Sequence, residues 1–101
     1  MNVKGNRLYI FARFHSKPGL ERRVEEEIVK VLGPTRAEPE CLGANMFRSL
    51  RDERLFYIHS SWQSEASFDW HVEQPHTKAF VEAVAALIDH PLDVVRTQLL
   101  D

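Results

Sequence analysis

The chain has 101 residues, of which 44% are hydrophobic and 28% are charged, and its formal net charge is −2. This size and balance predict one globular domain, residues 1–101, with a core of ordinary size. A small net charge without a long run of one sign argues against a surface for nucleic acid or anionic membrane. No apolar run reaches the ~20 residues of a membrane span, and a signal-peptide core is not seen near the N-terminus. The single cysteine, Cys41, permits neither an intrachain disulfide nor a cysteine-based zinc site. We therefore expect a cytoplasmic protein.

The first third of the chain predicts a strand followed by an amphipathic helix. Residues 1–6 are polar and should form a flexible N-terminus. Residues 8–15, LYIFARFH, are rich in β-branched and aromatic side chains, and both faces of the predicted strand carry apolar groups. After the turn residues SKPG, apolar side chains at positions 20, 24, 28, 31 and 32 have the spacing of a helix with one buried face. Local rules end this helix at Gly33–Pro34, although proline is tolerated in the first turn of a helix that restarts.

The middle of the chain predicts a β-hairpin. Residues 43–50 and 54–62 read as two strands, and only the polar residues Arg51–Glu53 separate them. So short a loop requires antiparallel pairing. One face of the second strand should carry Phe56, Ile58, Ser60 and Trp62, because side chains alternate along a strand.

Two short helices and a last strand complete the pattern. Ser64 is suited to cap a helix on which Phe68 and His71 share one face. Pro75 suits the first position of a second helix, and residues 92–100 predict a final strand. The order β-α-β-β-α-β is the split βαβ, or ferredoxin-like, pattern of an α+β fold with a four-stranded antiparallel sheet.

Five histidines prompt a search for a metal site, but their spacing does not support one. His71 and His76 are five residues apart with Pro75 between them, unlike the i, i+4 pair that places two ligands on one helix face. We find no nearby Asp or Glu to complete a triad, and we expect no metal. A G-x-S-x-G nucleophile elbow and strand-borne RNP motifs are also absent from the sequence.

Three motifs, in this order and spacing, carry a resemblance to a known family. They are SKPG at 16–19, EPECLG at 38–43, and a strand ending in Trp62 followed by SEASF, a histidine and QPHTKAFVEA. Over residues 8–99 the chain resembles the antibiotic biosynthesis monooxygenase family, which includes small bacterial quinol monooxygenases. The family often has Glu two residues before the tryptophan, where this chain has Ser60. The resemblance implies that the first helix continues, kinked, to Glu38.

The resemblance also implies an assembly and an activity. Two copies should pair as a homodimer, the dimeric α+β barrel, which would cover the sheet face that the helices leave bare. The expected activity is the cofactor-independent oxidation of a quinol or related polyphenolic, polyketide-like aromatic by O2. Once deprotonated, such a substrate is electron-rich enough to reduce O2 itself. The protein then needs only to remove a proton and to stabilise the anion.

The residues expected to do this work lie on several predicted elements. His71 is the candidate general base, because imidazole changes charge near neutral pH. Asn45 offers an uncharged amide that could hold an oxyanion, and Arg13 could hold an anion or form an ion pair across the dimer. The expected substrate-binding residues are Arg13, Asn45, Trp62, Phe68 and His76.

Two other functions remain open on the same fold. One is a non-catalytic dimeric module that binds a ligand or serves in a stress response. The other is a haem-binding or haem-degrading monooxygenase, since some relatives bind haem iron through a helix histidine. Those relatives also use an asparagine on the first strand, where this chain has Ala12, which argues against haem but leaves it open. We expect no cofactor, because the sequence has neither a Gly-rich dinucleotide fingerprint nor a ligand cluster at usable spacing. The sequence leaves open the identity of the substrate, the base and any higher oligomeric state.

Overall fold

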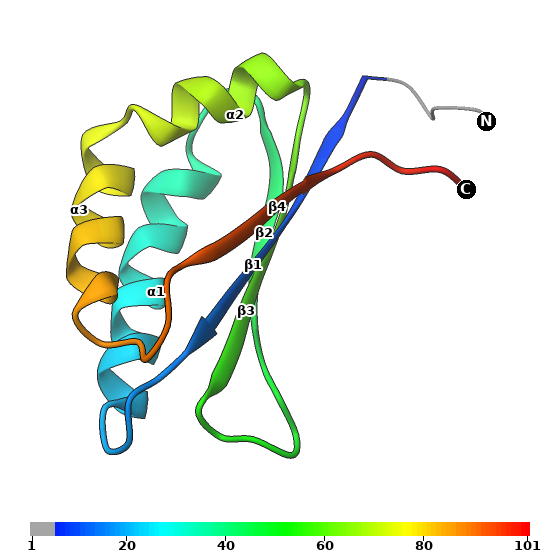
Figure 1. Cartoon of the computed structure of the whole chain (residues 1–101). Coiled ribbons are helices and arrows are strands. Elements are labelled where there is room, and N and C mark those ends of the chain that lie inside the picture. The colour runs from blue at the N-terminus through cyan, green and yellow to red at the C-terminus, as the bar shows by residue number, and fades with distance from the viewer. Residues whose placement is uncertain (1–5) are drawn as a thin grey trace.

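The computed structural model of the chain describes residues 6–101, so most of the expected flexible N-terminus lies outside the described residues. The elements are β1 (Leu8–His15), α1 (Glu21–Arg36), β2 (Cys41–Arg48), β3 (Leu55–Trp62), α2 (Glu65–Val72), α3 (Pro75–Ala85) and β4 (Asp93–Thr97). They form one four-stranded antiparallel sheet of order β2-β3-β1-β4 (Figure 1). The predicted ferredoxin-like α+β fold is confirmed, with the second helical position divided between α2 and α3.

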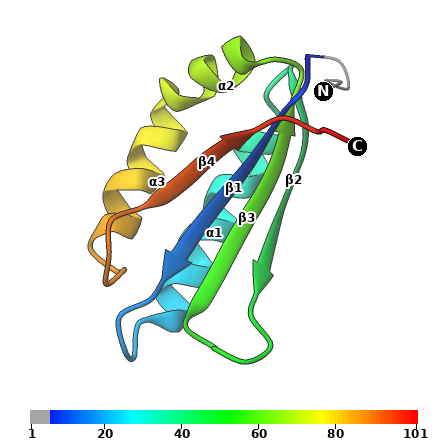
Figure 2. The same ribbon diagram turned by 45° about the vertical axis from the view of Figure 1, so that its right-hand side comes forward.

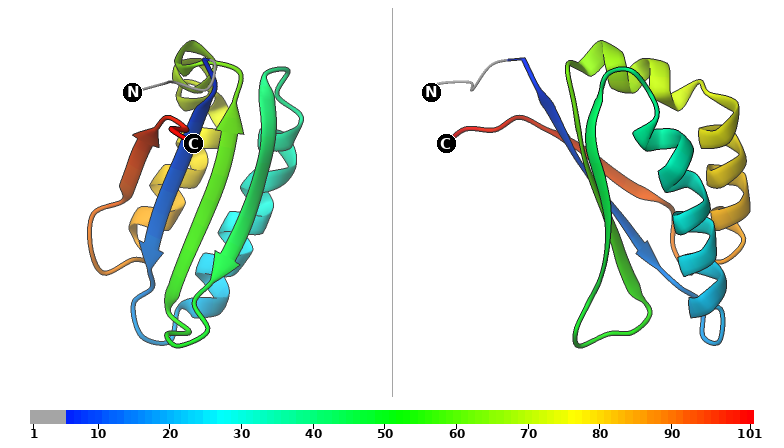
Figure 3. Two further views of the ribbon diagram at one scale, coloured as in Figure 1. Left: turned by 90° about the vertical axis from the view of Figure 1, so that its right-hand side faces the viewer. Right: turned by 180° about the vertical axis from the view of Figure 1, so that it is seen from behind.

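All three helices cover the same face of the sheet. Figure 3 shows them on one side only, with the other face of the sheet turned to the viewer in its left panel. Alternation along β1 buries Leu8, Ile10, Ala12 and Phe14 beneath the helices and leaves Phe11 exposed on the other face. The core therefore lies between one face of the sheet and the helices. Figure 2 shows α2 at the end of the sheet where β1 begins and β3 ends.

Local sequence signals account for how the helices begin and continue. Helix α1 runs through Pro34 and ends at Arg36, so the continuation beyond the proline is confirmed, although Glu38 lies just outside it. Ser64 caps α2, because its hydroxyl accepts the backbone N–H of Ser67. Pro75 occupies the first turn of α3 as expected.

The two edge strands differ from their predicted ranges. Strand β2 begins at Cys41, earlier than the expected residue 43, with a bulge between Cys41 and Gly43, and it ends at Arg48. Strand β4 covers only Asp93–Thr97 of the expected residues 92–100. Each edge strand has one neighbour, so it ends where that neighbour stops pairing with it. For β4 this neighbour is β1, and their pairing spans only residues 9–13 of β1.

The face that no helix covers carries exposed apolar side chains from three strands. Phe11, Phe47 and Val95 are 50%, 51% and 47% exposed.

None of the helices formed by residues 6–101 is both long and apolar enough to cross a membrane.

Candidate active site

A cavity of about 640 Å³ lies between the covered face of the sheet and the helices. Its walls are mainly apolar and include Ile10, Phe14, Leu32, Ile58, Phe68 and Phe80. Four buried polar residues also line it: Thr35, Ser60, His71 and Thr77. A largely apolar cavity with a few convergent polar groups is the usual form of a small-molecule site, and this volume lies within the usual range.

A buried carboxylate joins two histidines at one side of this cavity. Glu38 has a side chain that is only 4% exposed, and its Oε2 lies 2.6 Å from His71 Nδ1 and 2.6 Å from His76 Nε2. An ionised carboxylate only accepts hydrogen bonds, so both ring nitrogens donate to it. A neutral His71 therefore carries its proton on Nδ1 and its lone pair on Nε2. Among residues 6–101, the side-chain hydrogen bonds of His71 all involve Nδ1.

Packing holds the His71 ring in place. The rings of Trp62 and Phe68 lie 4.6 and 5.4 Å from it, centroid to centroid, and the Thr77 hydroxyl is 3.3 Å from Nδ1. Burial lowers the pKa of His71 below its usual 6.5, against the opposing effect of Glu38. The ring is therefore neutral at neutral pH, and its free nitrogen is basic.

A hydrogen bond joins the first turn of α2 to the link between α1 and β2, which contains Glu38. Ser67 donates its hydroxyl hydrogen bond to Glu40, which lies two residues after Glu38 in the link between α1 and β2. The backbone N–H of Glu38 in turn donates to the Thr35 carbonyl near the end of α1. These bonds set the start of α2, and so His71, against Glu38.

The expectation that no acidic residue accompanies the histidines was wrong. Glu38 precedes His71 by 33 residues, and only the packing of α1 against α3, with α2 packed against α3, brings them together. The sequence signal for this carboxylate was Glu38 as the first residue of the motif EPECLG, which we interpreted only as a family signature. Glu38 Oε1 is the one buried side-chain oxygen or nitrogen within residues 6–101 that lacks a hydrogen-bond partner.

The expected substrate-binding residues fall into two groups. Phe68 lines the cavity, Trp62 is buried against the His71 ring, and His76 contacts Glu38. Asn45 and Arg13 instead lie on the bare face of the sheet, where Asn45 is exposed and pairs in register with His59. Alternation places Ala44, not Asn45, on the covered face. The structure therefore does not bring Asn45 or Arg13 to His71.

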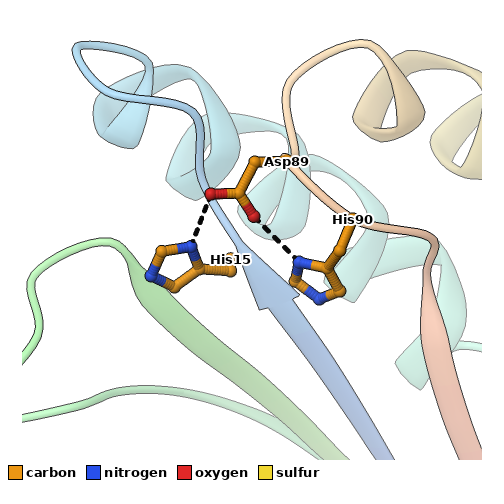
Figure 4. Close-up of side chains that lie close together, drawn as sticks. All are labelled: His15, Asp89 and His90. Carbon is orange, nitrogen blue, oxygen red and sulfur yellow. Dashed lines mark hydrogen bonds and ion pairs between the residues drawn. The ribbon is translucent and has the colours of Figure 1, made fainter.

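A second group of titratable side chains joins the last residue of β1 to two loops at the opposite end of this strand (Figure 4). Asp89 accepts hydrogen bonds from His15 Nδ1 at 2.8 Å, His90 Nδ1 at 3.0 Å and Arg54 Nη2 at 2.9 Å. His15 Nε2 also lies 2.9 Å from Asp52 Oδ2, so both ring nitrogens meet carboxylates. The two carboxylates raise the pKa of His15, and the neighbouring histidines and Arg54 lower that of Asp89 to about 2. Sequence reasoning missed this group because its members come from β1 and from two loops that are far apart in the sequence.

Each of these two groups has the donor types of a metal site. In Glu38, His71 and His76, as in His15, Asp89 and His90, the donor atoms lie within 4.8 Å of one another. Zinc bonds of 2.0–2.1 Å in tetrahedral geometry place nitrogen and oxygen ligands about 3.4 Å apart. The 2.6 Å contacts of Glu38 are hydrogen-bond lengths, and Asp89 is already engaged by Arg54. Both groups fit hydrogen-bonded networks better than metal centres.

Comparison with known proteins identifies the family of this chain. Residues 7–83 match the family model described as antibiotic biosynthesis monooxygenase. The chain belongs to this family. It is 31% identical over 83 residues, or 82% of its length, to the Bacillus subtilis (strain 168) protein named "Putative monooxygenase YcnE", of which 87% is covered.

Solved structures of similar proteins share the fold of this family member. Rv0793 from Mycobacterium tuberculosis has a TM-score of 0.90 at 23% identity, covering 95% of this chain and 97% of that one. PA3566 from Pseudomonas aeruginosa has a TM-score of 0.88 at 24% identity, covering 99% and 100%. At these identities the likeness concerns the fold alone.

Proposed function

We propose that this member of the antibiotic biosynthesis monooxygenase family oxidises a quinol or a related polyphenolic aromatic with O2 and without a cofactor. The observation that carries the proposal is the pairing of His71 with the buried Glu38 beside an apolar cavity of about 640 Å³. This arrangement leaves a neutral imidazole with a free nitrogen next to a space that suits an aromatic ring.

In the proposed reaction, His71 Nε2 takes a proton from a hydroxyl group of the bound substrate. Glu38 stabilises the imidazolium that forms, as a carboxylate does in other histidine–carboxylate pairs. The substrate anion passes an electron to O2, and the two radicals combine to form a C–O bond and a ring-bound peroxide. His71 returns its proton to the outer oxygen of the peroxide, and the ring carbon loses its hydrogen as a second proton. The O–O bond then breaks, a C=O bond forms on the ring, and the outer oxygen leaves as water with these two protons. One oxygen atom enters the substrate, the other becomes water, and the substrate supplies all four electrons.

The test is oxygen uptake by the purified protein with a panel of quinols and anthrones. We expect uptake of one O2 per substrate, and with ¹⁸O2 one labelled atom in the product and one in water. His71→Ala should lower kcat by roughly 10²–10⁴, the usual range for a positioned acid–base group. His90→Ala, at the other end of β1, is the matched control and should keep the wild-type rate.

Two results would contradict the proposal and favour the alternatives. Tight binding of aromatics without oxygen uptake would indicate a ligand-binding module. Uptake that appears only after haem is added, with a Soret band, would indicate a haem-dependent enzyme. A folded His71→Ala variant within about threefold of the wild-type rate would remove His71 as the base.

A further inference from the structure

Ser60 presents a hydroxyl proton with no partner in the cavity wall that it shares with His71. Its side chain lies on the covered face of β3 and is 5% exposed. Its Oγ accepts the indole N–H of Trp62 at 3.0 Å, and indole nitrogen is only a donor, so the direction of this bond is certain. Among residues 6–101, Ser60 Oγ has no other hydrogen-bond partner. The O–H of Ser60 is therefore available to a ligand.

The surroundings of this hydroxyl increase its strength as a donor. Ser60 is flanked in register by Ile10 of β1 and Ala44 of β2, which are both buried and apolar. A hydrogen bond in such surroundings is electrostatically stronger than in water. The bond from Trp62 also orients Oγ before any ligand arrives, which reduces the reorganisation needed when charge develops.

The indole ring of Trp62 contacts both Ser60 and His71, the proposed base. Trp62 donates to Ser60 through Nε1, and its ring packs 4.6 Å from that of His71, centroid to centroid. The free hydroxyl proton and the His71 ring therefore both border the cavity, next to one fully buried side chain. One ligand ring can lie against both.

We propose that the Ser60 hydroxyl donates a hydrogen bond to the substrate oxygen that becomes negatively charged, so that the cavity selects phenols and enols bound as their anions. Ser60 thus takes the role that the sequence suggested for Asn45, which lies on the other face of the sheet. For turnover this inference rests on the proposed function, but anion binding at Ser60 does not require turnover.

The binding test uses p-nitrophenol, whose phenolate absorbs visible light and forms near neutral pH. Its ionisation is followed by absorbance across a pH series with wild-type protein in excess, and then with Ser60→Ala. A hydrogen bond to the anion lowers the pKa of the bound phenol. We expect the bound pKa to be about one to two units lower in wild type than in Ser60→Ala, the effect of one hydrogen bond to a charged group.

Ser61→Ala is the matched control, because Ser61 is the same residue type one position along β3 and faces the other side of the sheet. It should leave the bound pKa at the wild-type value. Ser60→Cys places a side chain of nearly equal size but with a weak S–H donor at this position, so it should give the same bound pKa as Ser60→Ala. It serves as the second variant if Ser60→Ala folds poorly. Ser60→Asp should raise the bound pKa, because a carboxylate there repels the anion.

Three results would overturn the inference. They are equal bound pKa values in wild type and both neutral variants, an equal shift in Ser61→Ala, and the failure of wild type to bind p-nitrophenol at all. With a substrate that wild type oxidises, Ser60→Ala should lower kcat by about 10²–10³ without moving the pH midpoint set by His71. If no substrate is oxidised, the proposed function fails while the p-nitrophenol titration still decides the role of Ser60.

Discussion

At the scale of single residues, the protonation state of His71 controls the proposed chemistry. Burial lowers its pKa below 6.5, and only the neutral ring accepts a proton. We expect kcat/KM to be constant near neutral pH and to fall as the pH drops through a midpoint below 6.5. A pH profile of oxygen uptake measures this midpoint. A profile without an acidic limb would mean that a different group accepts the proton.

Glu38 should set both the tautomer and the basicity of that ring. In Glu38→Gln the side chain no longer carries a charge that favours the imidazolium, so the pKa of His71 should fall further. The amide can also turn its N–H₂ group toward Nδ1, which stabilises the tautomer with the proton on Nε2. We expect kcat to fall by roughly 10²–10⁴ while KM changes little.

NMR titration of the His71 ring in Glu38→Gln measures the pKa change without any turnover. His76→Gln is the informative partner variant, because it keeps an N–H donor for Glu38 but removes a second imidazole whose charge lowers the pKa of His71. The two variants should therefore move the pKa of His71 in opposite directions. A pKa that responds to neither change would contradict the network.

At the scale of elements, His15 joins the end of β1 to the β2–β3 loop through Asp52 and to the α3–β4 loop through Asp89. Because the pKa of His15 is raised in the folded state, the folded state binds a proton at this ring more tightly than the unfolded state does. Its stabilising contribution is fully present below pH 6.5 and is lost as the pH rises through the folded-state pKa. The guanidinium groups of Arg54 and Arg13 also lie in this cluster and add positive charge to it.

Urea unfolding of wild type and His15→Gln from about pH 5 to pH 9 tests this coupling. The wild-type advantage in unfolding free energy should be largest at the acidic end of the range and should shrink as the pH rises. Titration of His71 affects both proteins equally, so it cancels in the difference. A difference that is constant across the range would show that His15 acts only through packing.

At the scale of the whole molecule, the helices leave one face of the sheet bare. We propose that a second copy covers this face in a two-fold homodimer, the commonest form of oligomer. The exposed Phe11, Phe47 and Val95 supply an apolar centre for such an interface, on the side of the sheet away from His71. Arg13 and Asn45 lie on the same face, so we expect their side chains to lie at this interface and not beside the substrate.

Sedimentation at micromolar concentration should show a dimer for wild type and a monomer for Phe11→Glu, because a buried unpaired carboxylate opposes association. Val29→Glu is the matched control, since Val29 is similarly exposed, at 55%, but lies on α1. It should remain dimeric. A wild-type monomer would refute the pairing, as would dissociation by Val29→Glu alone.

The sequence by itself determined the features that depend on neighbouring residues. Strand β1 was predicted from residue 8 to residue 15 because alternation and β-branched side chains act locally. The buried face of α1, the Ser64 cap and the start of α3 at Pro75 follow from spacing and from single-residue geometry. Their order along the chain was enough to predict the ferredoxin-like fold.

Only the tertiary structure decided which side chains meet. Glu38 reaches His71 across 33 residues, and no periodic pattern records such a contact. A one-residue alternation separates Asn45, on the bare face, from Ala44, on the covered face, so the amide that looked suited to hold an anion faces away from the base. Ser60 and Trp62 could be placed on one face from the sequence, but the bond that frees the Ser60 proton depends on side-chain packing. Local structure follows from local propensity, whereas the site depends on how the packed elements bring distant residues together.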